Sequence, residues 1–324
     1  MNRPFPHLLG LALTAVVLAG CGTSSDHGLR LAMRALQTPT PTLPSPPPKK
    51  VTCANPTASL RPPATMPAPG HMPSHSFMST IQHQGYLRAG VNTGAFYFGY
   101  LDPRTGEIKG FEIDLLRQLA HAIFGDWNPN RVHTLALRVS QKEYAVAHGQ
   151  VDIVVDGVTV SCKRKLEVDF SSVYYQANQK VLVPRTSDAT DISAFYHQRV
   201  CATTGSIPYD FLKSNYPQVM AYGTAQAIDC LPLMQEGLIP AISTDDAILI
   251  GFRHQDPNTK IIGGILSPAP YGMEISKEHP EFVRFVNGVL AKLRADGTWR
   301  ALFDKWLYGI PNANPVLPPP QYDG

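Results

Sequence analysis

The sequence predicts an α/β protein built from two α/β units in series. Short β-branched apolar runs alternate with amphipathic helical stretches between residues 85 and 155, and the same alternation returns between residues 199 and 244. Hydrophobic residues make up 44% of the 324 residues, which is enough for two buried cores. Each unit would hold a small sheet, and the strand tips of the two sheets could face one another across a cleft.

The first unit follows a βαβαβ order. Its first helix has Leu116, Leu119, Ala120 and Ile123 at spacings of i, i+3, i+4 and i+7, and it ends at Gly125. The predicted strands are 85–91, 131–139 and 151–155, and a second helix is predicted over 141–148. This order is typical of a parallel sheet with helices on its faces.

The second unit repeats the order, and the chain then closes with a helical segment. The predicted strands are 199–204, 219–222 and 239–244, and the predicted helices are 205–216 and 224–236. Two strands near 260–266 and 271–276 follow, then a long amphipathic helix from Phe282 to Leu293. A last apolar stripe from Trp299 to Leu307 is expected to lie in a core.

The segment after the strand 151–155 carries residues that suit an anion. Gly157 lets a ligand approach the backbone, the Thr159 hydroxyl can donate a hydrogen bond, and the guanidinium of Arg164 matches a carboxylate with two donors. The alternative is a strand-to-loop turn with a surface arginine. Local chemistry alone leaves both interpretations open.

The N-terminus is predicted to be a lipoprotein signal peptide over 1–20. Leu18-Ala19-Gly20-Cys21 is similar to a bacterial lipobox, in which Cys21 is lipidated and becomes the new N-terminus. An ordinary signal peptide and a short membrane anchor are the alternatives, but the apolar run is shorter than the roughly 20 residues of a spanning helix. Lipidation would place the protein at the cell membrane, on its extracytoplasmic face.

Proline-rich segments flank the predicted globular part. Residues 21–79 are predicted to be a semi-extended spacer and 311–324 a proline-rich tail, because such sequences bury little apolar surface. The formal net charge of +3 is small and its residues are scattered, which argues against a nucleic-acid partner. Without Cys21 four cysteines remain, which allow two disulfides in three connectivities, and none of them has zinc-finger spacing.

Several motifs together resemble one protein family. They are Gly110-Phe111-Glu112-Ile113-Asp114, Val151-Asp152-Ile153, Thr159 with Arg164, Val168-Asp169-Phe170-Ser171 with Tyr174-Tyr175, and Asp296-Gly297-Thr298 with Lys305-Trp306. In this order and spacing, over about residues 80 to 310, they are similar to the family 3 extracellular solute-binding proteins, the polar amino-acid receptors of ABC importers. The lipobox, the spacer and the cysteine placement resemble the actinobacterial glutamine-binding lipoprotein branch.

This resemblance implies a two-lobed, periplasmic-binding-protein-like fold of type II with two hinge crossovers. Lobe 1 would comprise 80–185 and 266–310, and lobe 2 would comprise 186–265. An amino acid would bind between the lobes, with its α-carboxylate on Arg164, Thr159 and the backbone beside Gly157, and its α-ammonium on Asp245. The implied ligand-binding residues are Asn92, Phe96, Gly157, Thr159, Arg164, Thr204, Ser206 and Asp245.

Some of these assignments have alternatives or departures. Asp245 could instead cap the helix that follows it. Val139 and Ser140 stand where the family usually has an aromatic residue over the ligand, and Thr203 stands near the position of a lysine in the glutamine receptors. The expected ligand is therefore glutamine, glutamate, aspartate or asparagine, and the candidates for selecting its side chain are Asn92, Gln141, Lys180 and Thr244.

The lobe assignment that the resemblance implies favours one disulfide connectivity. Cys201 and Cys230 would both lie in lobe 2, so a bond between them would leave the hinge free. Cys53 would then pair with Cys162 and hold the spacer near Arg164.

The expected protein is a monomeric receptor without a cofactor. It would hand its ligand to an ABC permease, and a sensor that passes its liganded state to a membrane signalling protein is the first alternative. A dehydratase-type enzyme on the same scaffold is the second, and it would need a general acid or base in the cleft, for which Glu112, Glu143 and Glu274 are the candidates.

Overall fold

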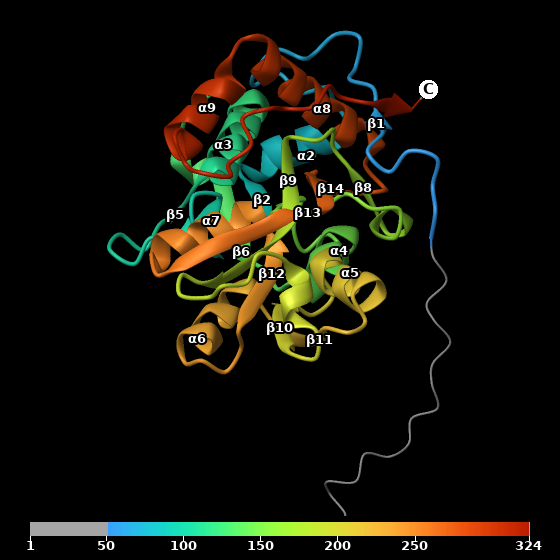
Figure 1. The fold of residues 1–324 in the computed structure, drawn as a ribbon. Coiled ribbons are helices and arrows are strands. Elements are labelled where there is room, and N and C mark those ends of the chain that lie inside the picture. Colours follow the sequence, from blue (N-terminus) through green and yellow to red (C-terminus); the bar gives the residue numbers. More distant parts are fainter. Residues whose placement is uncertain (1–50, 324) are drawn as a thin grey trace, which may run out of the picture. The chain divides into compact units, whose positions relative to one another are not determined.

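A computed structural model describes residues 51–323, which form two lobes with a five-stranded sheet each (Figure 1). The two-lobed α/β fold predicted from the sequence is confirmed. The predicted signal peptide, Cys21 and the first part of the spacer lie outside the described residues.

Lobe 1 has the sheet order β6-β2-β7-β14-β8. Its strands are β2 (Leu87–Val91), β6 (Val132–Ala136), β7 (Ile153–Val155), β8 (Val168–Phe170) and β14 (Glu274–Ser276), and its helices are α2 (Phe77–Gln84), α3 (Phe111–Phe124), α4 (Lys142–Ala147), α8 (Pro280–Ala295) and α9 (Thr298–Leu307). Ile153 and Val155 pack in the large core with α2, α3, α8 and α9, whereas Val154 packs in a smaller core with α4. Helices therefore cover both faces of β7, so the strand is apolar at every position.

Lobe 2 has the order β11-β10-β12-β9-β13, in which β9 runs antiparallel to both of its neighbours, β12 and β13. Its strands are β9 (Tyr175–Pro184), β10 (Arg199–Thr203), β11 (Met220–Thr224), β12 (Ala241–Asp245) and β13 (Thr259–Tyr271), and its helices are α5 (Ile207–Asn215), α6 (Cys230–Gln235) and α7 (Asp246–Gln255). Leu212 of α5 belongs to one core and Leu249 of α7 to another, so this sheet is also covered on both faces.

The two lobes are joined by β9 and β13, which Figure 1 shows running from one lobe to the other. The two strands pair from Thr259 to Ile262, shift register, and pair again from Ser267 to Tyr271. These are the two predicted hinge crossovers. Separate strands were predicted near 260–266 and 271–276, but β13 is one 13-residue strand because β9 supplies a partner along both of its paired segments.

Shorter elements complete the lobes and correct one predicted helix. They are the small sheet β3 (Gly94–Ala95), β4 (Gly99–Leu101) and β5 (Ile108–Lys109), and the 3-10 turns η1 (Pro129–Arg131), η2 (Val139–Gln141), η3 (Arg164–Leu166), η4 (Ile192–Phe195) and η5 (Ala227–Asp229). The helix predicted over 224–236 begins only at η5 and continues as α6, because Thr224 still pairs in β11 with Thr203.

Segments predicted as spacer and tail pack onto lobe 1. The strand β1 (Ser59–Leu60) pairs with β15 (Tyr322–Asp323), and Asn287 of α8 donates hydrogen bonds to Ser59 Oγ at 2.7 Å and to Leu60 O at 2.6 Å. Helix α2 then starts within the predicted spacer range. The chain thus joins lobe 1 earlier than the range 21–79 predicts, because Ser59 and Leu60 form hydrogen bonds with β15 and with Asn287 there.

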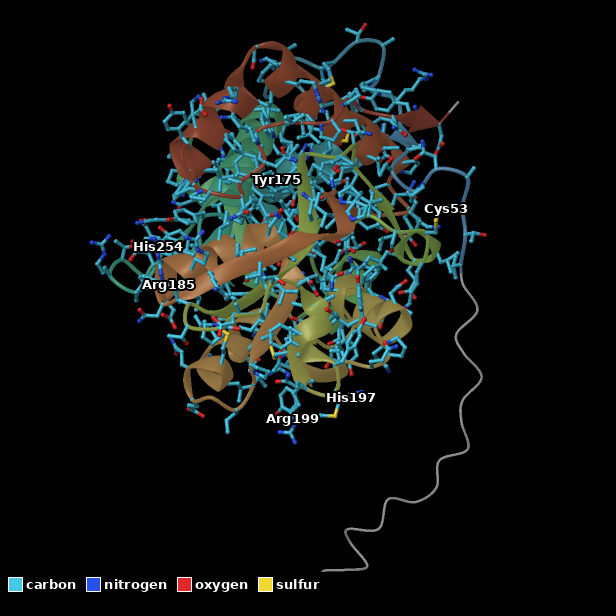
Figure 2. The ribbon with its side chains drawn as sticks, viewed as in Figure 1. Cys53, Tyr175, Arg185, His197, Arg199 and His254 are labelled. Carbon is cyan, nitrogen blue, oxygen red and sulfur yellow. A yellow bond between two sulfur atoms is a disulfide. The ribbon has the colours of Figure 1, made fainter. Side chains whose placement is uncertain are left out.

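Both disulfides have the pairing that the family resemblance implied. Cys201 and Cys230 join β10 to α6 within lobe 2, and Cys53 is bonded to Cys162. Figure 2 labels Cys53 near the start of the described chain, whereas Tyr175 lies inside lobe 1 and Arg185, His197 and Arg199 lie on the surface of lobe 2. The bond between Cys53 and Cys162 therefore ties the start of the described chain to the loop that carries Arg164.

Candidate ligand-binding site

A cleft with about 660 Å³ of empty space, partly open to solvent, lies between the two lobes. Lobe 1 contributes strand tips and loops, namely Asn92, Gly94, Ala95, Leu137, Val139, Lys142, Asp156, Gly157, Thr159 and Arg164. Lobe 2 contributes Thr203, Ser206, Ile207, Pro208, Gln226, Ala227, Ile228, Thr244, Asp245 and Ile248. The cleft is thus complete only when both lobes are present, as the two-unit sequence pattern predicted.

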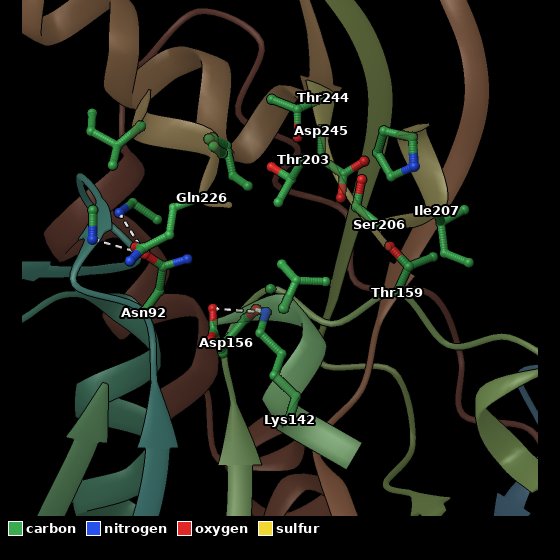
Figure 3. Close-up of a pocket in the computed structure, with 18 of the residues that line it drawn as sticks. Asn92, Lys142, Asp156, Thr159, Thr203, Ser206, Ile207, Gln226, Thr244 and Asp245 are labelled. Carbon is green, nitrogen blue, oxygen red and sulfur yellow. Dashed lines mark hydrogen bonds and ion pairs between the residues drawn. The ribbon is translucent and has the colours of Figure 1, made fainter. Parts of the chain in front are cut away.

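The structure brings most of the predicted ligand-binding residues to this cleft. Those that line it are Asn92, Gly157, Thr159, Arg164, Ser206 and Asp245. They come from four separate stretches of the chain, around Asn92, over 157–164, and at Ser206 and Asp245, and both lobes contribute to the set. Figure 3 shows Thr159, Ser206 and Asp245 on one side of the cleft and Asn92 on the other.

Phe96 and Thr204 do not line the cleft. The ring of Phe96 stacks on His254 with 4.2 Å between centroids, while its neighbour Ala95 faces the cleft. Thr204 is exposed and lies over Gly223, while Thr203 is buried at the cleft. In both cases the prediction was one residue out of register, because neighbouring side chains of an extended chain point to opposite sides.

Arg164 stands in the turn η3 and its side chain is buried at the cleft. Its Nε donates to Glu143 Oε1 at 2.7 Å and one terminal nitrogen donates to Thr159 O at 2.8 Å. A guanidinium has five N–H donors, so three remain for a ligand. The surface-arginine alternative is therefore wrong, since Arg164 is held in place by two partners and faces the cleft.

Gly157 shapes the lobe 1 wall by its backbone conformation. Its φ of +55° lies in the left-handed region, and an added Cβ would contact the ring of Tyr271 at 3.4 Å. Its N–H donates to Glu112 Oε1 at 2.8 Å, and Tyr174 Oη donates to the same oxygen. Glu112 therefore already accepts from the N–H of Gly157 itself, and donation to a ligand carboxylate from the backbone beside Gly157 remains a prediction.

Asp245 ends β12 and is almost completely buried. Tyr271 Oη donates to its Oδ2 at 2.9 Å, and its Oδ1 has no hydrogen-bond partner among the described residues. Burial raises the pKa of Asp245 to about 7, although the bond from Tyr271 acts in the opposite direction. Asp245 occupies the N-cap position of α7, but its side chain makes no capping bond, so the carboxylate remains directed to the cleft.

Ser206 combines a structural bond with a place at the cleft. Its Oγ accepts a hydrogen bond from Tyr209 N at 3.2 Å and so caps the first turn of α5. The hydroxyl proton stays free to be donated to a ligand. The helix start beside it favours an anion.

A buried ion pair in the cleft was not predicted. Lys142 Nζ lies 3.1 Å from Asp156 Oδ1, and Figure 3 shows the pair on the lobe 1 side, between Asn92 and Thr159. One signal could have found it. Asp156 directly follows the strand 151–155, and Lys142 lies near the start of the helix predicted over 141–148, which follows the strand before it. Both residues therefore lie where parallel strands end.

The residues predicted to select a ligand side chain separate into two groups. Asn92 and Thr244 line the cleft, and Asn92 Oδ1 accepts from Gly94 N and Ala95 N, which leaves its NH₂ group to donate. Gln141 accepts from Arg138 N and Lys180 donates to Asn312 Oδ1, both away from the cleft. Gln226 is an additional cleft residue that sequence reasoning missed.

The three candidate catalytic carboxylates do not line the cleft. Glu112 accepts hydrogen bonds from Gly157 and Tyr174, Glu143 pairs with Arg164, and Glu274 is fully buried.

None of the helices between residues 51 and 323 combines the length and the hydrophobicity that a membrane-spanning helix requires.

Two lobes that are joined by two crossing strands and enclose a polar cleft define a hinged ligand-binding protein. The chain matches the model of the bacterial extracellular solute-binding proteins, family 3, over residues 87–309, and so it belongs to that family. Proteins of this family are receptors and not enzymes, and this chain is one of them.

Relatives and solved structures agree with this assignment. The chain is 27% identical over 231 residues to the ABC transporter glutamine-binding protein GlnH of Bacillus subtilis, covering 71% of this chain and 84% of the relative. It is 24% identical to the glutamate-binding protein GluB of Corynebacterium glutamicum, covering 67% and 80%. A crystal structure of a mutant ArgBP from T. maritima superposes with a TM-score of 0.65 at 25% identity, covering 71% and 98%.

Proposed function

We propose that the protein is a lipid-anchored, extracytoplasmic receptor that binds a polar amino acid between its lobes and delivers it to an ABC importer. The polar amino acid is glutamine, glutamate, aspartate or asparagine. One observation carries the proposal: Arg164 from lobe 1 and Asp245 from lobe 2 line the same cleft with opposite charges.

An α-amino acid has the complementary charges. Its α-carboxylate fits the unused donors of Arg164 together with the hydroxyls of Thr159 and Ser206, and its α-ammonium fits Asp245. Because the arginine and the aspartate belong to different lobes, a zwitterion satisfies both only when the lobes are close together. Binding is thereby coupled to closure, and the closed form is the one that a membrane partner can recognise.

Support for the polar class and the importer comes from the family and its relatives. The names of the two relatives above refer to glutamine and glutamate, and the first is a protein of an ABC transporter. Anchoring rests on lipidation of Cys21, outside the described residues. Membership of the actinobacterial glutamine-binding lipoprotein branch and a monomeric state remain predictions.

The test is isothermal calorimetry with each of the twenty amino acids, using the chain without residues 1–20 and with Cys21→Ser. We expect binding of one or more of the four polar amino acids and none of the cationic or aromatic ones. Arg164→Ala should abolish binding, since it removes the α-carboxylate donor. Arg185→Ala is the matched control, because Arg185 is exposed on lobe 2, and it should bind like the unmodified protein. Preference for arginine would contradict the polar class, and undiminished binding by Arg164→Ala would contradict the site.

A further inference from the structure

The ion pair between Lys142 and Asp156 has an unusual place for two charges. The two residues are 5% and 1% exposed, and both line the cleft. In Figure 3 they lie between Thr159, Ser206 and Asp245 on one side and Asn92 and Gln226 on the other. A ligand whose α-groups contact the first set would extend its side chain past this pair.

The hydrogen bonds of the pair are incomplete. Lys142 Nζ donates to Asp156 O at 2.9 Å and faces Asp156 Oδ1 at 3.1 Å, so one of its three protons has no partner within residues 51–323. By strict hydrogen-bond geometry neither carboxylate oxygen of Asp156 has a partner among the same residues, and its polar neighbours are Lys142 and the side chain of Asn92. Buried charges without complete hydrogen bonding are costly, and a ligand group at this position would supply the missing partners.

We propose that Lys142 and Asp156 bind the end group of the ligand's side chain, and that Asp156 is ionised when this group is a carboxamide and protonated when it is a carboxylate. Lys142 donates to the oxygen that both end groups have. An ionised Asp156 accepts from the NH₂ of a carboxamide, whereas a protonated Asp156 donates to the second oxygen of a carboxylate. The extra proton comes from bulk water. The inference rests on the proposed function and adds the groups that read the side chain.

The surroundings of Asp156 are compatible with both protonation states. Burial raises its pKa, while Lys142, the side chain of Asn92 and the more distant Arg164 act in the opposite direction. The other titratable groups that face it are Glu112 on α3, Tyr174 beside β9, and Glu274 on β14. These carboxyls disfavour a further negative charge, so an acidic side chain is expected to enter together with a proton.

A comparison of two ligands isolates this effect from the other titrations. Asp245 faces the α-ammonium of every amino acid in the same way, and Glu112 and Glu274 do not line the cleft, so we expect their protonation changes to cancel in the ratio of two dissociation constants. If one extra proton accompanies the acid, the aspartate-to-asparagine affinity ratio should rise about tenfold for each unit by which the pH falls. The glutamate-to-glutamine ratio should do the same.

The experiment is calorimetry of these four amino acids between pH 6 and 8, in buffers of different ionisation enthalpy, which counts the protons taken up. We expect the acids to take up about one proton more than the amides. Asp156→Asn should remove that difference and the pH dependence of the ratio, because an amide does not titrate. Lys142→Met should weaken binding of all four ligands but not of alanine. Glu274→Gln is the control and should keep the difference.

The outcomes separate this inference from the proposed function. A ratio independent of pH, or an Asp156→Asn variant with the original pH dependence, would overturn the inference while binding itself persists. If Lys142→Met unfolds, the double variant Lys142→Met with Asp156→Asn removes both charges, and a pH-dependent ratio in it would also overturn the inference. Binding of no amino acid by the unmodified protein, or unchanged binding by Arg164→Ala, would instead contradict the proposed function.

Discussion

At the scale of single residues, the main feature is a set of buried carboxyls around the cleft. Burial raises the pKa of Glu112 and of Asp245 to about 7 and that of Glu274 to about 8. The hydrogen bonds that Glu112 and Asp245 receive from tyrosines only partly offset this effect. Of these three carboxyls only Asp245 lines the cleft, so it is the one whose protonation near neutral pH should affect ligand binding directly.

Amino-acid affinity should depend on pH through Asp245. A protonated Asp245 cannot pair with an α-ammonium, so affinity for every ligand should be highest above its pKa of about 7 and should fall about tenfold per pH unit below it. Calorimetry of asparagine between pH 5.5 and 8.5 measures this. Asp245→Asn should bind weakly at all pH values, and a wild-type affinity that stays constant from pH 5.5 to 7 would argue against the role of Asp245.

Stability without ligand should depend on pH through Glu274. Its pKa is about 8 in the folded protein against an ordinary value of 4.5, so the folded protein binds the proton more tightly than the unfolded chain does. This contribution to the free energy of unfolding is fully present below pH 4.5 and is lost as the pH rises through 8. Glu274→Gln removes a buried, ionised carboxyl and should stabilise the protein at pH 8.5 by roughly 1–3 kcal/mol, with little effect at pH 5. Urea denaturation at the two pH values tests this, with the exposed Glu278→Gln as the control.

At the scale of helices and strands, hydrophobic periodicity predicted most of the fold. The strand 151–155 and the helix through Leu116 to Ile123 were found because their apolar spacing depends only on local geometry. The length of β13 and the start of α6 were missed, since both depend on pairing with strands distant in sequence. Local periodicity carries no information about such partners.

The same limit explains which site residues could be predicted. Arg164 and Asp245 follow strand ends and match a family pattern, so sequence reasoning found them. Thr204 was chosen instead of Thr203 because the last residue of β10 could not be fixed to better than one position. Lys142 and Asp156 were missed because they lie 14 positions apart in the chain, and the packing of α4 beside β7 brings them together.

The disulfide between β10 and α6 should stabilise lobe 2 without taking part in binding. Both sulfurs are buried in a core of lobe 2, and neither cysteine lines the cleft. Replacing Cys201 and Cys230 by serine should lower the free energy of unfolding by about 3–4 kcal/mol, from the 29-residue separation that the bond closes. Denaturant unfolding measures the loss, and calorimetry should show a dissociation constant within about twofold of the original.

A matched comparison uses the other disulfide. Replacing Cys53 and Cys162 by serine frees the loop two residues before Arg164, so amino-acid affinity should fall as well as stability. Equal effects of the two double variants on affinity would show that this bond does not position the arginine.

At the scale of the whole described chain, the lobes contact one another outside the cleft as well as across it. Tyr97 Oη lies 2.9 Å from His254 Nδ1, and Lys163 Nζ lies 3.5 Å from Asp210 Oδ2. Each contact joins lobe 1 to lobe 2. Such contacts form only when the lobes are close, so they stabilise the closed form without touching the ligand. The closed form is therefore stabilised both by these contacts and by the two charges of the ligand.

Tyr97→Phe should therefore weaken binding without changing amino-acid preference. The variant loses one hydrogen bond of the closed form, which corresponds to about 0.5–1.5 kcal/mol and hence to an affinity about two- to tenfold lower for each ligand. Small-angle scattering should show that saturating asparagine still decreases the radius of gyration, but only at higher ligand concentration. Tyr308→Phe is the control, since Tyr308 is 73% exposed. A Tyr97→Phe variant with altered preference would mean that Tyr97 acts on the ligand, and one with unchanged affinity would mean that this contact does not contribute to closure.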